Sequence, residues 1–506
     1  MRISTLCAVR YAVVVLLSFL TGLSAVAQTA PVWQSVISLG GQHSISGFTI
    51  DGAGNYYLTG YFSRPVTIAG RQLTTAGGFD GYVAKLSPSG TLLWLHQLGS
   101  TDHDHVHSVA VDKVGNVYVT GSATGTLALG NNLTFTGPAG TEGTMFLIRY
   151  SPQGIAEWVQ QSNTIAFSTG TSMGFDAAGN LYLTGLYERA LTIGSTTITS
   201  SNSLRTTRTG YLSRFAAATG SLQSLKTVFH SDATRAVFNG PKLIVLPTGS
   251  TYILTSILSN ATFGSSTTVT HPNPDSKLNG IAAKYDAQGT LEWVQHFKGG
   301  DNRIDAGVAD AAGNLFVVGD FYGTTAFGSS ILTTSGYINS YDTYLTKISS
   351  QGVMQWIQRS VGDGDEHWND VKLDASGSPY VSGSFQLTTA FGSLSLTAFG
   401  SGFHDIVVAA YTPQGQIKWV KQAGSTGFAF DYAQFLAFTS QYDLSVLGNV
   451  GGNSTFGPLS LSAGTTENTF LAHLNTSVLA TQTPRPSALS MYPNPATDWV
   501  QLSACL

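Results

Sequence analysis

The amino-acid sequence predicts an all-β fold built from one unit repeated seven times. A glycine followed four residues later by tryptophan recurs at intervals of roughly 61 to 69 residues. Each interval also holds three stretches of the kind that half-buried strands show, in which apolar and polar residues alternate. Aromatic residues make up 11% of the chain and charged residues 10%, which suits short strands joined by tight turns. Four antiparallel strands per unit is the content of a propeller blade, so the sequence predicts a seven-bladed β-propeller.

The glycine–tryptophan marker defines the repeat. Its complete copies are Gly90 and Trp94, Gly154 and Trp158, Gly289 and Trp293, Gly352 and Trp356, and Gly415 and Trp419. Gly220 and Ser224 keep the spacing without the ring, and Trp33 stands at the front without a preceding turn. We expect the tryptophans to pack in the core, where each buries about 150–250 Å². The alternative is an aromatic platform for carbohydrate.

The second copy shows the order of elements in one unit. It predicts strands at Ser108–Asp112, Val117–Gly121, Phe146–Tyr150 and Glu157–Gln161, with an extra hairpin inserted at Thr126–Thr136. This hairpin explains a period longer than that of simpler propeller repeats, and it recurs in the other units. The third strand carries a base near its end, which we expect to occupy a polar position between blades or at a rim: Lys85, Arg149, Arg214, Lys284 and Lys347.

A turn of the form Asp-x-x-Gly-Asn joins the first two strands of several units. It begins at Asp51, Asp112, Asp176 and Asp310, and a variant begins at Asp374. Glycine supplies the positive φ that such a turn needs, and Asp and Asn satisfy nearby backbone groups. Calcium binding is the functional alternative, but the turn lacks the dense alternating aspartates of calcium loops.

The two ends of the repeat region predict how the ring closes. The strands that contain the marker number seven, and a three-strand set follows each of them. The last set ends at Phe470–Leu474 without a marker strand after it, whereas Trp33 has no set before it. We therefore expect the N-terminal strand around Trp33 to complete the last blade, which limits exposed sheet edges.

The ends of the chain differ in composition from the repeats. Residues 1–27 are expected to be a secretory signal peptide, with an apolar stretch at 11–20 and a small-x-small cleavage pattern at Ala25–Ala27. A transmembrane anchor is the alternative, but this stretch is short for a bilayer. We assign residues 28–475 to the propeller, 476–488 to a linker with two prolines, and 489–506 to a separate C-terminal segment.

Composition narrows the function classes. The net charge of −4 gives no basic footprint of the kind that nucleic-acid-binding proteins carry. The two cysteines are Cys7, inside the expected signal peptide, and Cys505, so the mature chain cannot form an internal disulfide. No later segment is apolar enough to cross a membrane, and we expect a monomer with no cofactor.

Two resemblances rest on short motifs. The segment Tyr492–Ala496 (YPNPA) followed by an apolar strand resembles the start of the type IX secretion C-terminal sorting domain, which directs export across the outer membrane. The match covers about 15 residues, so residues 489–506 resemble a truncated start of that domain. The segment Asp112–Gly121 (DKVGNVYVTG) resembles the bacterial secreted β-propeller repeat family. That resemblance implies a propeller and an extracellular or cell-surface setting, and it supplies no enzymatic residues to carry over.

Candidate binding residues recur eight positions before the first turn of a unit. They are His43, Asp104, Asn302, Glu366 and Asp431. If each leads into the innermost strand, these groups surround one mouth of the central channel and form a weak cation or polar-ligand site. The alternative is a turn cap repeated by duplication.

A second pattern is the alternation of His103, His105 and His107, which could chelate a transition metal from one face of a strand. The alternative is a polar connection with solvated imidazoles, which we favour, so no metal site is predicted.

No catalytic constellation is evident in the sequence. There is no Gly-x-Ser-x-Gly elbow, phosphate loop or paired metal-ligand cysteine. The sequence therefore favours a secreted or outer-cell-surface binding, adhesion or scaffold module that is not an enzyme, reaches its location through the periplasm, and binds a surface polysaccharide or protein. The type IX export machinery is a further expected partner. The alternative function is an extracellular carbohydrate-active enzyme with its active site on one propeller face.

Overall fold

The structure of the protein is a computed structural model. It describes residues 31–41, 43–138, 142–164, 166–201, 207–231, 237–272, 277–336, 340–400, 403–427, 429–462, 467–477, 491–493 and 500–502. The chain divides into a strand-rich part, Val32–Asn475, and a second part formed by Met1–Pro31 and Thr476–Leu506. The described residues form strands and turns without a helix, as the all-β prediction requires. Accordingly, none of them belongs to a helix that could cross a membrane.

The strand-rich part consists of antiparallel sheets in which four strands pair in the order first, second, third, fourth. The first to third sheets are β2 (Ser44–Ile50), β3 (Tyr56–Phe62), β6 (Asp80–Leu86) and β7 (Leu92–Leu98); β8 (His105–Val111), β9 (Val117–Ala123), β12 (Thr144–Tyr150) and β13 (Ala156–Gln161); and β14 (Ser168–Phe175), β15 (Asn180–Tyr187), β18 (Thr209–Ala216) and β19 (Ser221–Ser231).

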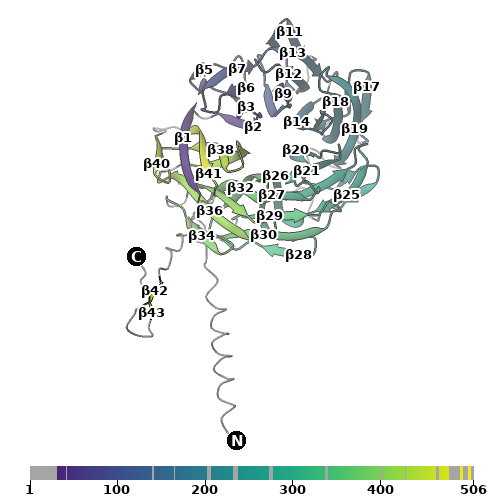
Figure 1. Ribbon diagram of the computed structural model, residues 1–506. Helices are drawn as coiled ribbons and strands as arrows, with labels where there is room; N and C mark the ends of the chain where they lie inside the picture. Colours follow the sequence, from purple (N-terminus) through teal and green to yellow (C-terminus); the bar gives the residue numbers. More distant parts are fainter. Residues whose placement is uncertain are drawn as a thin grey trace. The chain divides into compact units, whose positions relative to one another are not determined.

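Three further sheets repeat this order, and Figure 1 shows all of them around a common centre. The fourth to sixth sheets are β20 (Val237–Val245), β21 (Thr251–Ile257), β24 (Asn279–Tyr285) and β25 (Leu291–His296); β26 (Lys298–Ala309), β27 (Leu315–Phe327), β29 (Asp342–Ile348) and β30 (Met354–Gly362); and β31 (Glu366–Leu373), β32 (Pro379–Phe385), β35 (Asp405–Tyr411) and β36 (Ile417–Ser425).

The seventh sheet joins the two ends of the strand-rich part. It contains β37 (Tyr432–Phe438), β38 (Asp443–Val450), β41 (Asn468–Asn475) and β1 (Val32–Gly41). Strand β1 pairs antiparallel with β41, and Trp33 lies opposite Leu474. A hydrophobic cluster also connects this sheet with the first one, because Leu447 and Leu471 pack with Tyr56 and Leu58. Strand β1 is therefore the fourth strand of this sheet.

A small hairpin follows the second strand of each sheet, as the sequence predicts. The hairpins are β4 (Val66–Ile68) with β5 (Arg71–Leu73), β10 (Thr126–Gly130) with β11 (Leu133–Thr136), β16 (Ala190–Ile193) with β17 (Thr196–Thr199), β22 (Ala261–Phe263) with β23 (Thr267–Val269), the end of β27 with β28 (Ser330–Thr333), β33 (Thr388–Phe391) with β34 (Leu394–Thr397), and β39 (Asn453–Phe456) with β40 (Leu459–Ser462). Strands β22, β33 and β39 pair with the last strand of the preceding sheet, so these hairpins tie neighbours together.

In six of the sheets the first strand bulges against a glycine of the second strand. In the second sheet His107 is the extra residue, because Val106 pairs with Gly121 and Ser108 with Thr120. A Cβ on Gly121 would lie 1.9 Å from the carbonyl oxygen of His105, so only glycine fits there. The same arrangement recurs at Gly60, Gly185, Gly319, Gly383 and Gly448. The glycine that ends the Val-Tyr-Val-Thr-Gly motif therefore makes room for a bulge.

The fourth sheet is the exception that supports this explanation. Its second strand carries Ser256 where the others carry glycine. The register there shifts from Phe238–Ser256 directly to Lys242–Leu254, which leaves three residues of the first strand opposite one. A larger irregularity thus replaces the single-residue bulge where the glycine is missing.

Several marker tryptophans connect one sheet to the next. The indole Nε1 of Trp94 donates to the carbonyl oxygen of Pro152, and Trp356 donates to that of Pro413, at 3.2 and 3.1 Å. The marker glycine of the following turn lies against the ring, because a Cβ on Gly415 would come within 2.9 Å of Trp356. These rings are partly or fully buried. The contacts support the packing role of the tryptophans over a carbohydrate platform.

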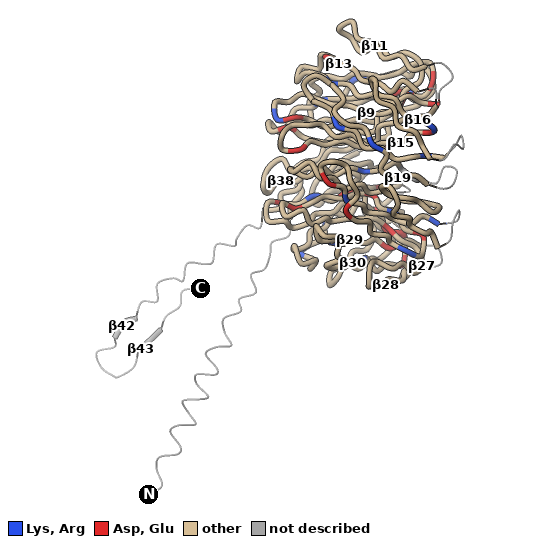
Figure 2. The backbone as a smooth tube through the Cα atoms, turned by 90° about the vertical axis from the view of Figure 1, so that its right-hand side faces the viewer, with Lys and Arg blue, Asp and Glu red and all other residues tan. Residues whose placement is uncertain are grey.

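The turn aspartates and third-strand bases are engaged inside the protein. The Asp51 carboxylate accepts hydrogen bonds from the backbone of Ala53 and Asn55 and from the Tyr57 hydroxyl. Lys85 Nζ donates to the carbonyl oxygen of Pro152 in the next sheet, as the predicted position between blades requires. The aspartates therefore act as turn caps. Figure 2 shows that charged residues are few and scattered over the strand-rich part.

Most of the two chain ends lies outside the described residues. This holds for the expected signal peptide at 1–27 and for nearly all of the linker at 476–488. Within 489–506 the structure describes β42 (Met491–Pro493) and β43 (Val500–Leu502), which pair antiparallel.

Candidate functional site

A polar cavity lies where the first strands of the sheets meet. Its volume is about 350 Å³, and residues of β2, β8, β14, β20, β26, β31 and β37 line it. A contiguous hollow, which shares Ser46, His107, Thr171 and Lys242 with this cavity, extends it past Tyr61 and Phe167. The volumes of the cavity and of the contiguous hollow, about 350 and 460 Å³, suit a small polar ligand or the end of a longer one.

One position of each first strand points into this cavity. We call these residues the channel ring: Ser46, His107, Thr171, Lys242, Asp305, Asn369 and Gln434. Each lies five residues before the first residue of the following turn, as His107 lies before Asp112. In six sheets it is the extra residue of the bulge; in the fourth, Lys242 directly follows the wider irregularity. Because an extra residue is turned out of the ladder, every ring side chain becomes available to the cavity.

The four neutral ring residues are bound to the adjacent first strand. Thr171 Oγ1 donates to the carbonyl oxygen of Pro241 at 2.6 Å, and Asn369 Nδ2 donates to that of Ala433 at 3.0 Å. Ser46 Oγ and Gln434 Nε2 donate in the same way to Val106 and Ile45. These four side chains therefore hold neighbouring first strands together.

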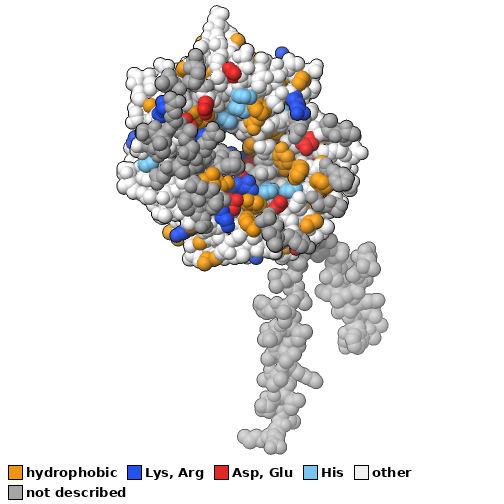
Figure 3. Space-filling view, turned by 180° about the vertical axis from the view of Figure 1, so that it is seen from behind, with side chains coloured by type: hydrophobic (Ala, Val, Ile, Leu, Met, Phe, Trp, Pro, Cys, Tyr) orange, Lys and Arg blue, Asp and Glu red, His pale blue; other side chains and the backbone are white. Residues whose placement is uncertain are grey.

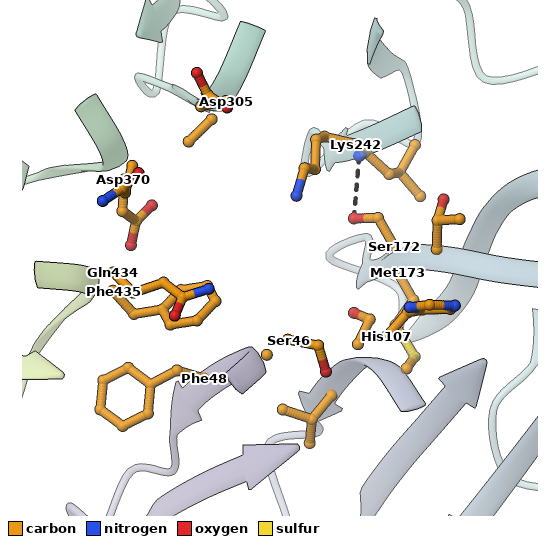
Figure 4. Close-up of a pocket in the computed structure, with 18 of the residues that line it drawn as sticks. Ser46, Phe48, His107, Ser172, Met173, Lys242, Asp305, Asp370, Gln434 and Phe435 are labelled. Carbon is orange, nitrogen blue, oxygen red and sulfur yellow. Dashed lines mark hydrogen bonds between the residues drawn. The ribbon is translucent and has the colours of Figure 1, made fainter. Parts of the chain in front are cut away.

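The three ionisable ring residues form no such link among the described residues. Asp305 Oδ2 is buried without a hydrogen-bond partner. Burial, and next the charge of Asp320, raise the pKa of Asp305 to about 7. Burial, followed by the charges of His105 and Lys242, lowers the pKa of His107 to about 3. Lys242 is exposed to the cavity, and Figure 4 shows its amine directed into the open space across from Asp305 and Asp370. Unlike the four neutral ring residues, the side chains of His107, Lys242 and Asp305 thus make no hydrogen bond to a neighbouring first strand in the described part of the chain.

A second polar group lies beside the channel, between the fifth and sixth sheets. Arg303 binds Asp320 through two hydrogen bonds of 2.8 and 3.1 Å, and Asp320 also accepts a hydrogen bond from His367 Nδ1 at 2.5 Å. Burial lowers the pKa of His367, but the hydrogen bond to Asp320 and the negative charge of Asp320 together outweigh burial, so the pKa is raised. His404 stacks on His367 with 5.6 Å between ring centroids. Figure 3 shows histidines together with basic and acidic side chains near the central opening.

The five residues predicted to surround a channel mouth lie at the start of five first strands. All are buried: His43, Asp104, Asn302, Glu366 and Asp431. Four of them cap nearby polar groups. Asp104 accepts from the backbone of Ser100 and Thr124, Asp431 from that of Ser425 and Gly451, and Asn302 from that of Gly280. Glu366 accepts from the Thr389 and Ser360 hydroxyls, and burial raises its pKa to about 9.

His43 is the member of this set that borders a hollow. It lies beside Tyr61 and Arg64, while its Nδ1 donates to the carbonyl oxygen of Gly41 at 2.8 Å. The structure brings no two of the five into contact within its described part, and their polar atoms face the protein. This geometry agrees with the repeated cap that we weighed as the alternative; a binding role for the five residues stays a prediction.

His43 predicts a pH effect on stability. Burial lowers its pKa from 6.5 to about 4, so the unfolded chain takes up a proton at a pH where the folded chain does not. Stability is therefore lost as the pH falls from 6.5 towards 4. At about 1.4 kcal/mol per pH unit, His43 should cost about 2 kcal/mol at pH 5 relative to pH 8. Urea unfolding should show that the deficit of His43→Asn shrinks by this amount between pH 8 and pH 5; a constant deficit would contradict it.

The histidine stripe of the second sheet forms a stack. The rings of His103 and His105 are 6.5 Å apart and those of His105 and His107 are 5.9 Å apart, all close to parallel. Among the described residues, the group whose ligand atoms approach one another closely enough for a metal is a different one, Asp365, His367 and His404. No spacing in the sequence predicts this group, because its members come from separate loops and strands.

The comparisons with known proteins support a propeller repeat. Residues 93–127 match the family model described as "Beta-propeller repeat". An uncharacterised WD repeat-containing protein of Acanthamoeba polyphaga mimivirus is 30% identical over 143 residues, which is 26% of this chain and 10% of that protein. The chain carries propeller-type repeats. It matches only about a tenth of the length of this curated relative.

Solved structures resemble the chain only loosely. A polysaccharide lyase PL25 ulvan lyase covers 82% of this chain and 93% of its own, with 8% identity and a TM-score of 0.43. A puromycin hydrolase covers 87% and 57%, with 11% identity and a TM-score of 0.41. A protein of unknown function from Dyadobacter fermentans covers 89% and 99%, with 9% identity and a TM-score of 0.38.

Proposed function

We propose that this protein is an exported seven-bladed propeller, closed by β1, that binds an acidic carbohydrate in its central channel without chemical turnover. Antiparallel pairing of β1 with β41 and the packing of the seventh sheet on the first support the closed ring. Repeated four-stranded sheets around a common centre are the content of a propeller. Binding at the channel is a natural use of such a ring, since all seven first strands contribute one polar side chain to it.

The division of the channel ring carries the binding proposal. Its neutral members are occupied in linking strands, whereas Lys242, His107 and Asp305 face the cavity without such links. A buried polar atom without a partner is costly, so Asp305 Oδ2, which faces the same cavity as the exposed Lys242 amine, supports a ligand that hydrogen-bonds to it. Lys242 supplies an ammonium for a carboxylate or sulfate, while His107 and Asp305 can bind sugar hydroxyls. A sugar unit that carries an acidic group presents both an anion for Lys242 and hydroxyls for His107 and Asp305.

The test compares Lys242→Met with Lys113→Met. Lys113 lies exposed in a turn away from the channel, so its substitution controls for the loss of one positive charge. The full chain should bind acidic but not neutral glycans on an array, and calorimetry should show at least a tenfold weaker affinity for Lys242→Met alone, about 1.4 kcal/mol. Equal affinities of the two variants, or no binding to acidic glycans, would reject the proposal.

An enzyme is the second candidate, favoured by the convergence of Arg303, Asp320 and His367 on one side of the ring. A hydrogen-bonded Asp–His pair beside a guanidinium can move a proton next to a bound anion. Any glycan that binds should therefore be incubated with the protein and analysed for shorter products. Cleavage that His367→Gln abolishes would replace the non-catalytic proposal.

Export remains part of the proposal. The apolar stretch at 11–20 with its cleavage pattern and the Tyr492–Ala496 motif support a route through the periplasm to the outside or the outer surface. Mass spectrometry of the protein recovered from its natural host should find the mature N-terminus near Gln28. An intact residue 1–27 segment on the recovered protein would contradict this.

A further inference from the structure

Three potential metal ligands converge between the fifth and sixth sheets. Asp365 lies in the loop before β31, His367 on β31, and His404 directly before β35. The ligand atoms that they offer all lie within 4.8 Å of one another. Figure 3 shows the surface around the central opening where such side chains gather. Two imidazoles and one carboxylate form a donor set typical of divalent transition-metal ions.

Each of these side chains is held by a neighbouring group. His367 Nδ1 lies 2.5 Å from Asp320, and His404 Nδ1 lies 3.1 Å from Ser384 Oγ. Both rings thus have Nε2 left as the nitrogen for a metal. A carboxylate that holds the far nitrogen of a ligand histidine is the usual arrangement at metal centres, where it fixes the ring and strengthens the ligand.

The carboxylate of Asp365 is positioned in a comparable way. Its Oδ1 accepts a hydrogen bond from the backbone nitrogen of Tyr341 at 2.9 Å, which leaves Oδ2 as the ligand atom. The backbone nitrogen of Asp365 itself is bound by Gln386 at 3.1 Å. The loop that carries this carboxylate is therefore tied to the sheets on both sides.

The surroundings leave space for an additional ligand. Asp365, His367 and His404 line a hollow together with Asn369, Phe430 and Tyr432. The Arg303 guanidinium donates two hydrogen bonds to Asp320 and lies over the Tyr341 ring, and none of these contacts involves the three proposed ligands. A metal held by three protein ligands here would keep an open position towards the hollow, as catalytic and ligand-binding metal sites do.

We propose that Asp365, His367 and His404 bind one divalent transition-metal ion of the Zn²⁺ class, with water or an exogenous ligand in the open position. Bond lengths of 2.0–2.1 Å place tetrahedral ligand atoms about 3.3 Å apart. Because the ligand atoms now lie within 4.8 Å of one another, binding draws them together by at most roughly 1.5 Å. The inference is independent of the acidic ligand proposed for the channel, since it concerns different side chains.

The experiment measures Zn²⁺ binding to the full chain after removal of metals with a chelator. Calorimetry should find one ion per chain, and Co²⁺ should give the visible absorption of a low-coordinate site. Asp365→Asn and His404→Gln should each weaken Zn²⁺ binding about 100-fold or more, and Ser384→Ala should weaken it about tenfold, because it releases the ring of His404. His105→Gln in the histidine stripe of β8 is the matched control and should bind like the parent protein.

The outcomes separate the possibilities. Circular dichroism and the thermal midpoint without metal establish that each variant folds, and Asp365→Asn keeps the test valid if the buried His404 cannot be replaced. No binding at about 1 mM Zn²⁺, Ni²⁺ or Co²⁺ would overturn the proposal. Binding that His105→Gln removes and Asp365→Asn spares would also overturn it and assign the metal to the stripe. Glycan affinity is read separately with Lys242→Met, so failure of one proposal leaves the other standing.

Discussion

Replacing Gly121 by alanine should destabilise the protein by about 3 kcal/mol or more. The added Cβ would lie 1.9 Å from the carbonyl oxygen of His105, a backbone atom that can move only if the bulge moves. Overpacking in a core commonly costs about 1–3 kcal/mol, and here no flexible side chain can yield. The loss should appear as a lower urea midpoint.

Gly52→Ala is the matched control for Gly121→Ala. Nothing lies within 4 Å of the Cβ that it would add, and its backbone is not left-handed. We expect its urea midpoint to stay within the change caused by about 0.5 kcal/mol. If Gly121→Ala were equally mild, the glycine would not be needed for the bulge, and the explanation of the repeated motif would be wrong.

Trp33→Ala should cost about 3–5 kcal/mol, the range for truncation of a buried aromatic side chain. Trp33 is 3% exposed, packs edge-on against Phe456 at 5.3 Å, and donates from Nε1 to the carbonyl oxygen of Gln422 at 3.3 Å. It thereby connects β1 to Gln422 and Phe456, which lie near the other end of the strand-rich part. The thermal midpoint and the urea midpoint should both fall.

Val32→Ala, one residue earlier on β1, separates the packing of Trp33 from the general tolerance of the strand. Val32 is 56% exposed, so its truncation should change stability by less than about 0.5 kcal/mol. Limited proteolysis should cleave the Trp33→Ala variant near its N-terminus faster than the Val32→Ala variant. Similar midpoints and cleavage rates for the two would show that β1 contributes little.

The arrangement of strands follows from the sequence because the repeat multiplies a weak local signal. Alternation of apolar and polar residues over five positions predicts a strand only weakly. The same order of alternating stretch, turn and marker in successive units, however, locates where the strands begin. Even the degraded copy at Ser224 forms β19 as its equivalents do. The partner of β1 could be predicted for a related reason. The last three-strand set of the repeat region has no marker strand after it, and β1 is the marker strand without a set before it.

The candidate sites could be predicted only in part. Position within the repeat indicated that residues before the turn matter, but the eight-residue offset led to buried residues, of which Asp104 caps the backbone of Ser100 and Thr124. The cavity is lined by the residues of the channel ring, which lie five positions before the turn. In six sheets the bulge that turns their side chains inward forms opposite a glycine of the second strand, which a local pattern does not reveal. Asp320, His367 and His404 belong to different strands and loops, so their approach is a product of packing that no local spacing expresses.

The pairing of Trp33 with Leu474 has a consequence for the order of events during synthesis. A chain that emerges N-terminus first presents β1 long before β41 exists, and closing so long a loop carries a large entropic cost. Strands β37 and β38 are made before β41, so the last sheet stays incomplete until β41 can pair with both β38 and β1. The first strand of the repeat region therefore stays without its sheet partner until the last strand has been made.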